Sequence, residues 1–189
     1  MERAEAVVEA VVSPLVTLSA NERSWIAQRL RPYHCDANVP LFPLGVRCEH
    51  IVLLYEGLVR SYFVEAEGRE SNQRFLGPPN VAVSLTSVIT QEPAEVCVEA
   101  VTPVVGFRMS LADLAESPRF HELMRVLAEQ HYLSMERRLR MLQHKFVRER
   151  YAFYRTHLDP AIVAGMPDFH VASYLGVSAE ALSRAKRPS

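Results

Sequence analysis

Hydrophobic and polar positions change their spacing twice along the chain. In the first part, Ser19-Ala-Asn-Glu22 predicts a helix start, because the Ser19 side chain can accept from the Glu22 N–H while Glu22 reaches back. An apolar stripe of Trp25, Ile26 and Leu30 follows. We expect a short helix that ends near Pro32.

The middle part, residues 33–109, reads as short β-rich runs separated by Pro and Gly. The expected strands cover residues 50–55, 58–64, 73–76, 96–101 and 104–109. Residues 65–68 are expected to form a hairpin loop with Gly68 at the position that needs a positive φ. Short strands at a spacing of about 8–12 residues predict a sandwich or roll.

After Ser110 the pattern becomes helical. Ser117-Pro118 is a good helix start, and no Pro or Gly interrupts the chain from Arg119 to Asp159. A helix of about 28 residues would be about 40 Å long, which invites pairing with a second copy. Packing on its own roll alone is the alternative. The expected dimer positions recur at three- and four-residue steps: Phe120, Met124, Leu127, His131, Met135, Leu139 and Leu142.

The final stretch, Val171–Arg187, predicts two short helices joined by a turn. Pro167 can begin the first helix, Gly176 can end it in the left-handed conformation, and Ser178 can cap the second. Ala172 is small where two helices would cross closely. This combination predicts a helix-turn-helix. The alternative is a C-terminal pair of helices that only caps a core.

The second of these helices would present polar side chains to DNA. Glu can accept from cytosine N4, and Arg can bond guanine O6 and N7 together. The expected DNA-binding residues are Ser178, Ala179, Glu180, Ser183, Arg184, Lys186, Arg187, Ser173 and Tyr174. Among them, Ser173, Tyr174 and Lys186 are better placed for phosphates, which set register and affinity.

Composition narrows the class of protein. With 49% hydrophobic and 23% charged residues, the chain has ordinary globular chemistry. No apolar run approaches the roughly 20 residues of a membrane span, and the acidic N-terminus does not resemble a secretory signal. Three scattered cysteines, Cys35, Cys48 and Cys97, form no C-x-x-C pair. We expect a cytoplasmic protein without a membrane partner.

Charge is uneven along the chain although its net value is −1. Residues 1–100 carry eight Lys or Arg against thirteen Asp or Glu, whereas residues 101–189 carry thirteen against nine. A basic C-terminal half indicates contact with a polyanion. A solvated helix face is the alternative explanation.

A roll, a long helix and a helix-turn-helix in this order resemble the Crp/Fnr (catabolite activator/FNR-like) family of bacterial transcriptional regulators. The matching residues are Tyr55-x-Gly57-Leu-Val-Arg60, Glu67-Gly68-Arg-Glu70, and Pro167 with 171–184. The resemblance implies an α+β fold with an N-terminal double-stranded β-helix or jelly-roll domain of the cyclic-nucleotide-binding type. The expected domains are 1–116 (roll), 117–145 (dimerisation helix) and 146–189 (helix-turn-helix). A β-wing after the helix-turn-helix is not expected, since only Pro188-Ser189 follow the second helix.

The resemblance also implies a function. The chain would be a homodimeric, sequence-specific DNA-binding regulator, not an enzyme, with operator DNA and RNA polymerase as its partners. One recognition helix of each subunit would enter successive major grooves about 34 Å apart. Glu180 and Arg184 fall where family members read bases.

The chain departs from the family's cyclic-nucleotide pattern. Where the resemblance would place a Gly-Glu pair and an Arg-Ser/Thr pair, it has Val83-Ser84 and Ala94-Glu95. Without the Arg, a cyclic phosphate loses its charge-assisted bidentate partner, so no cyclic nucleotide is expected. The cysteines also lack the four-Cys set of iron–sulfur members. No cofactor is expected.

Two further readings compete. His34-Cys-Asp36 matches two thirds of an iron-binding triad, but no His lies between His50 and His121, so no metal is expected. A pocket for an unknown small-molecule effector could be lined by Arg60, Arg74, Ser84, Thr86 and Ser87; ordinary solvation of strands and loops is its alternative. The alternative function is a ligand sensor or protein-interaction module that does not bind DNA.

Overall fold

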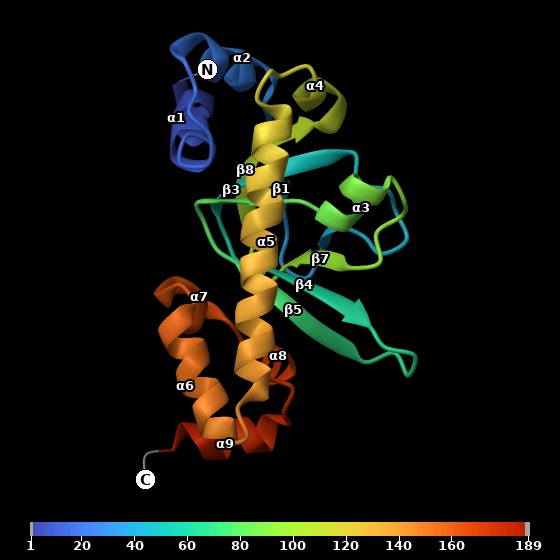
Figure 1. Ribbon diagram of the computed structural model, residues 1–189, viewed down its shortest axis with the longest axis vertical. Coiled ribbons are helices and arrows are strands. Elements are labelled where there is room, and N and C mark those ends of the chain that lie inside the picture. Colours follow the sequence, from blue (N-terminus) through green and yellow to red (C-terminus); the bar gives the residue numbers. More distant parts are fainter. Residues whose placement is uncertain (1, 188–189) are drawn as a thin grey trace.

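A β-roll lies between two groups of helices in the computed structural model, which describes residues 2–187. Figure 1 shows α1 and α2 at one end, α6 to α9 at the other, and α5 running along the roll between them. The expected chain end at Pro188-Ser189 lies outside the described residues. No described helix is both long enough and apolar enough to cross a membrane.

Two helices precede the roll, α1 (Glu2–Val11) and α2 (Ala20–Arg29). The capping box at the start of α2 is confirmed: the Glu22 N–H donates to Ser19 Oγ at 3.3 Å, and the Ser19 N–H donates to Glu22 Oε2 at 2.7 Å. Helix α1 was not predicted. Its valines Val7, Val8 and Val11 are buried in a core shared with α2 and the roll, so its stability comes from packing rather than from a local start signal.

The roll consists of two four-stranded antiparallel sheets, with strand orders β1-β8-β3-β6 and β2-β7-β4-β5. The strands are β1 (Arg31–Cys35), β2 (Pro40–Phe42), β3 (His50–Glu56), β4 (Val59–Val64), β5 (Glu70–Leu76), β6 (Asn80–Ala82), β7 (Cys97–Ala100) and β8 (Val104–Ser110). The five predicted strands are confirmed as β3, β4, β5, β7 and β8. Strands β1, β2 and β6 are three to five residues long and were missed. An apolar cluster from both sheets fills the space between them.

The short helix α3 (Leu85–Thr90) lies between β6 and β7, and the short helix α4 (Leu111–Ala115) follows β8. The long helix α5 (Phe120–Gln143) comes next. The predicted start of α5 was Ser117-Pro118, but these residues lie in a turn after α4, and the helix begins at Phe120. In that turn Ser117 Oγ accepts from the Arg119 N–H. The helix ends without a Pro or Gly. There the His144 carbonyl accepts from Arg150 Nε at 2.9 Å, a contact that the sequence pattern did not show.

Four of the seven residues predicted for the dimer helix pack on the chain's own core. Phe120, Met124 and Leu127 pack on the cluster shared with α1 and α2, and Leu142 packs on the C-terminal core. Of the seven, Leu139 is 60% exposed. An amphipathic pattern cannot distinguish a chain's own roll from a partner, because both require apolar side chains.

The C-terminal part consists of α6 (Val147–His157), α7 (Pro160–Gly165), α8 (Asp168–Leu175) and α9 (Ala179–Lys186). Their core includes Tyr154, Leu175 and Leu182, together with Leu58 and Phe75 from the roll. The C-terminal helices are therefore packed against the roll through apolar contacts.

Gly57 should be irreplaceable in the turn between β3 and β4. Its φ is +97°, and a Cβ there would lie 2.4 Å from the Pro103 carbonyl oxygen. We expect Gly57→Ala to lower the free energy of unfolding by about 2–4 kcal/mol, which combines left-handed strain with overpacking. Denaturant unfolding measures this loss.

The matched control is Gly68→Ala in the hairpin loop. Gly68 has φ +79°, which confirms its predicted conformation, but a Cβ there meets nothing within 4 Å. We expect a loss of about 1 kcal/mol from strain alone. Equal losses for the two variants would contradict the steric role of Gly57.

Candidate nucleic-acid interface

Helices α8 and α9 form a tightly joined pair. Gly176 ends α8 with φ +66°, and the Val177 N–H donates to the Ala172 carbonyl at 3.0 Å. The Ala181 N–H then donates to Ser178 Oγ at 3.2 Å, which caps α9 as predicted. Leu182 is fully buried and fixes α9 to its neighbours.

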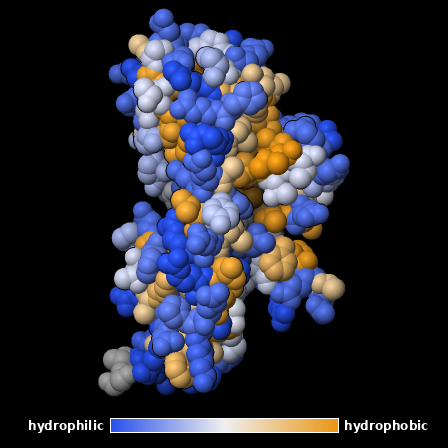
Figure 2. Space-filling model, in the orientation of Figure 1, coloured by the Kyte–Doolittle hydropathy of each residue, from blue (hydrophilic) through white to orange (hydrophobic). Residues whose placement is uncertain are grey.

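The outer face of α9 is open to solvent. Seven of the predicted DNA-binding residues are exposed on or beside α9: Ser178, Ala179, Glu180, Ser183, Arg184, Lys186 and Arg187. Hydrogen bonds from the Glu180 N–H and from Ser178 keep the pKa of Glu180 below its usual value. Neither Arg184 nor Arg187 forms an ion pair with a carboxylate of residues 2–187. This face therefore offers two exposed guanidinium groups and one ionised carboxylate, whose pKa the charge of Arg184 also lowers. In Figure 2 the C-terminal helices present mostly hydrophilic side chains.

The three residues predicted for phosphates are engaged elsewhere in the protein. Ser173 Oγ donates to the Glu70 carbonyl and accepts from the Asn72 N–H, both at 3.0 Å. Tyr174 is buried, with its ring 4.9 Å from that of Phe75. Lys186 pairs with Asp168. Ser173 and Tyr174 thus hold α8 on the roll instead of pointing to solvent, which corrects their predicted orientation.

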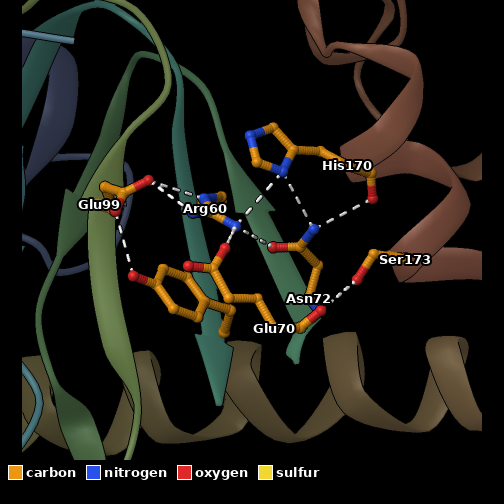
Figure 3. A network of polar contacts seen from close by, with 7 residues as sticks. Arg60, Glu70, Asn72, Glu99, His170 and Ser173 are labelled. Carbon is orange, nitrogen blue, oxygen red and sulfur yellow. Dashed lines mark hydrogen bonds and ion pairs between the residues drawn. The ribbon is translucent and has the colours of Figure 1, made fainter. Parts of the chain in front are cut away.

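A cluster of seven polar residues, here the polar network, joins the roll to α8 (Figure 3). Its members are Arg60 and Tyr62 of β4, Glu70 and Asn72 of β5, Glu99 of β7, and His170 and Ser173 of α8. Arg60 is its centre and is buried. Its Nε and Nη2 donate to Glu99 Oε1 at 2.9 and 2.7 Å, and its Nη1 lies 2.6 Å from Glu70 Oε2.

These bonds decide the charge of Arg60. Burial alone would lower its pKa, but the bonds to Glu70 and Glu99 outweigh burial and raise the pKa. Tyr62 adds its hydroxyl to Glu99 Oε2 at 3.1 Å and places its ring 4.0 Å from the guanidinium. The buried cation is therefore neutralised and held in one orientation.

His170 is neutral in this setting. Its Nδ1 lies 3.3 Å from both Arg60 Nη1 and Asn72 Nδ2, which are donors, so we assign Nδ1 as the acceptor and the proton to Nε2. Burial, followed by the Arg60 charge, lowers the pKa of His170 to about 4. Asn72 Nδ2 also donates to the His170 carbonyl at 3.2 Å.

The predicted effector pocket mixes two faces of one sheet. Arg60 lies opposite Glu99, whereas its neighbour Ser61 lies opposite Arg74. Residues opposite one another share a face and successive residues alternate. Arg60 therefore faces α8, and Arg74 faces the roll interior, which corrects the prediction of a common pocket.

Three of the predicted pocket residues do meet inside the roll. Arg74, Ser84 and Thr86 line a cavity of about 50 Å³ together with His131 of α5. Ser87 is absent from this lining and instead binds the Cys48 N–H and the Glu92 carbonyl. Such a volume suits one or two water molecules, whereas ligand pockets are typically several hundred Å³. This arrangement of the roll has no room for a cyclic nucleotide there.

The possible metal triad is not assembled. His34 Nδ1 and Asp36 Oδ1 are 3.9 Å apart on exposed side chains. Within residues 2–187 no group of three His, Cys, Asp or Glu residues could hold a metal ion.

Sequence reasoning missed five members of the polar network, namely Tyr62, Glu70, Asn72, Glu99 and His170. A signal existed for Glu99, because a carboxylate in the apolar run Val96-Cys-Val-Glu-Ala-Val101 needs a cation once the strand is buried. His170 carried no comparable signal, since its partners are about 100 residues away in the chain.

Removing Arg60 should strongly destabilise the fold. Arg60→Gln leaves the buried Glu99 without its cation, and we expect a loss of about 3–5 kcal/mol in the free energy of unfolding. Denaturant unfolding measures it. Arg69→Gln is the control, because Arg69 pairs with Glu65 at the exposed hairpin tip, and should cost less than about 1 kcal/mol. Similar losses for both variants would refute a central role for Arg60.

Acid should weaken the fold through His170. Its folded pKa of about 4 lies below its unfolded value of about 6.5, so the unfolded chain binds the proton more tightly. Stability should fall as the pH drops from about 6.5 to about 4, by up to about 3 kcal/mol, with no further loss from this group below pH 4.

His170→Asn tests this dependence, since its amide oxygen can replace the Nδ1 acceptor. The unfolding free energies of the wild type and of His170→Asn at pH 7, 5.5 and 4.5 should converge or cross as the pH falls. Only the wild type loses stability through the lowered pKa of His170. His121→Asn, at an exposed position on α5, is the control. A difference between wild type and His170→Asn that is constant with pH would contradict the assignment.

Comparison with known proteins reveals similarity of structure. No family model and no curated protein matches the sequence. FixK2 from Bradyrhizobium japonicum matches with 19% identity over 82% of each chain and a TM-score of 0.72. CLP, the c-di-GMP-responsive global regulator of Xanthomonas campestris, matches with 16% identity over 88% of this chain and 89% of its own, at a TM-score of 0.70. A CRP/FNR-family transcriptional regulator from Thermus thermophilus matches with 20% identity over 82% and 83%, at 0.62. The chain has the fold of Crp/Fnr transcriptional regulators.

Proposed function

We propose that the protein is a sequence-specific DNA-binding transcriptional regulator of the Crp/Fnr type, with α8–α9 as its helix-turn-helix and α9 as its recognition helix. The observation that carries the proposal is the outer face of α9. Its exposed residues include Arg184 and Arg187, which have no described ion pair, while Leu182 anchors the opposite face. A rigid helix with free guanidinium groups suits the major groove.

The polar network supports this function by positioning α8. Two hydrogen bonds fix Ser173 to β5, and His170 joins the Arg60 cluster. Because α9 packs directly on α8, these bonds, together with the apolar core of the C-terminal helices, orient the recognition helix relative to the roll.

A homodimer through the outer face of α5 completes the proposal. Tyr132 and Leu139 are 67% and 60% exposed, and Met135 lies between them, three residues after Tyr132 and four before Leu139. This is the spacing of a helix–helix seam. Two recognition helices related by a two-fold axis would then read a symmetric operator.

Selection of bound duplexes from a random DNA pool tests the proposal, using the full chain without added ligand at low and near-physiological salt. A two-fold-symmetric motif with half-sites one helical turn apart is expected. Arg184→Ala should weaken binding to that motif by about 1–3 kcal/mol, because it removes a base contact.

Arg31→Ala is the matched control, an equal loss of charge at an exposed position beside α2, and should leave affinity for the motif unchanged. No enriched motif at either salt concentration would overturn the proposal and favour a protein-interaction module. A symmetric motif bound equally by Arg184→Ala would reject α9 as the reading helix.

A further inference from the structure

A second, larger hollow lies where the roll, α5 and the C-terminal helices meet. Its volume is about 290 Å³. Its polar lining includes Arg74 and Asn80 from the roll, Gln130, Ser134 and Arg137 from α5, His157 from α6, and Tyr174 from α8. Their side chains provide hydrogen-bond donors from three separate parts of the molecule.

The two arginines in this pocket lack counter-charges. Arg74 contacts His131 Nδ1 at 3.4 Å, and Arg137 Nε donates to the Leu133 carbonyl at 3.3 Å. Neither forms an ion pair within residues 2–187. Two other arginines of α5 are paired, Arg125 with Glu129 and Arg140 with Glu136.

One carboxylate, that of Asp159, also lines the pocket. Its Oδ1 accepts from the Ala161 N–H at 2.7 Å and so caps α7. It forms no described ion pair with Arg74 or Arg137, and one carboxylate cannot neutralise two guanidinium groups. The pocket keeps a net positive charge.

The electrostatic surroundings confirm that Arg74 is an uncompensated cation. Burial, followed by the charge of Arg137, lowers the pKa of Arg74 to about 10. Burial, followed by the Arg74 charge, also lowers the pKa of His131. Its imidazole is therefore neutral and does not balance the charge of Arg74. On the ring of Tyr174 lies a third guanidinium, that of Arg138, whose buried Nε has no hydrogen-bond partner. Partly buried cations without counter-ions are costly, and an anion would relieve that cost.

We propose that this pocket binds a small oxyanion, the phosphate or carboxylate group of a small metabolite, between Arg74 and Arg137. Planar guanidinium forks match both groups through paired hydrogen bonds. Asn80, Gln130, Ser134 and the Tyr174 hydroxyl can donate to the remaining oxygens. The volume lies at the lower end of the range for small-molecule sites. This pocket is separate from the 50 Å³ cavity inside the roll, although Arg74 borders both.

The ligand would act as an effector, a consequence that rests on the proposed function. It would link the roll through Arg74, the long helix through Arg137 and the candidate helix-turn-helix through Tyr174. Tyr174 lies one helical turn from His170 on α8, next to the polar network. A ligand that favours one position of α8 shifts the protein toward that position, and DNA affinity changes with it.

Binding is tested without DNA, by calorimetric titration of the full chain with inorganic phosphate and, separately, with succinate at constant ionic strength. Saturable binding of at least one anion is expected, weakened at least about tenfold in Arg74→Gln and in Arg137→Gln. Arg140→Gln, one turn further along α5 and paired with Glu136, should bind as the wild type does. The stronger of the two anions identifies the class of ligand.

Thermal unfolding separates a binding role from a structural one. Arg74→Gln should unfold at or above the wild-type temperature in chloride buffer, because it removes an uncompensated cation, and should lose the stabilisation that the anion gives the wild type. The proposal is overturned if neither anion binds saturably up to roughly 20 mM, or if Arg74→Gln and Arg137→Gln bind as tightly as Arg140→Gln does. An anion that binds the wild type should alter its DNA affinity and leave that of Arg74→Gln unchanged. If the protein selects no DNA motif, anion binding still stands or fails on the calorimetry alone.

Discussion

The ion pair between Arg60 and Glu99, in which two guanidinium nitrogens donate to one carboxylate oxygen, is the interaction on which the arrangement of the two halves depends. A carboxylate in the middle of β7 is stable only beside a cation, and Arg60 lies directly opposite it in β4. The remaining guanidinium nitrogen reaches Glu70, Asn72 and His170. Because His170 belongs to α8, the neutralisation of a charge in the sheet also determines where the C-terminal helices dock.

Local rules were sufficient for much of the fold. The capping box of Ser19 and Glu22, the positive φ of Gly68 and Gly176, and the Ser178 cap were all predictable, because each depends on residues within four positions of one another. The same locality explains why the exposed face of α9 could be predicted from its sequence.

Predictions that required knowledge of a distant partner failed. The faces of Arg60 and Arg74 depend on the register of three strands and on an irregularity between Ser61 and Tyr62 in the β4–β5 pairing, which no local pattern encodes. Tyr174 was assigned to solvent because α8 was considered with α9 alone. In the structure α8 also packs on β5 and α6, so most of its residues are covered. The apolar stripe of α5 likewise did not show which of its residues pack on the chain's own core.

The two arginines on opposite faces of the β4–β5 sheet differ in one physical respect, which explains their different roles. Arg60 is surrounded by two carboxylates, so its charge is satisfied within the chain and an additional anion there would meet repulsion. Arg74 is also largely buried but has only a neutral imidazole beside it. The free-energy cost of burying the Arg74 charge is not offset unless an anion binds. Both arginines lie against the same helix, α8: Arg60 contacts His170, and Arg74 lies beside Tyr174. An anion bound to Arg74 can therefore shift the position of α8, which the ion pairs of Arg60 otherwise hold. A coupling free energy of about 1–3 kcal/mol is typical of such linked sites, and it would suffice to change DNA affinity by roughly five- to a hundredfold.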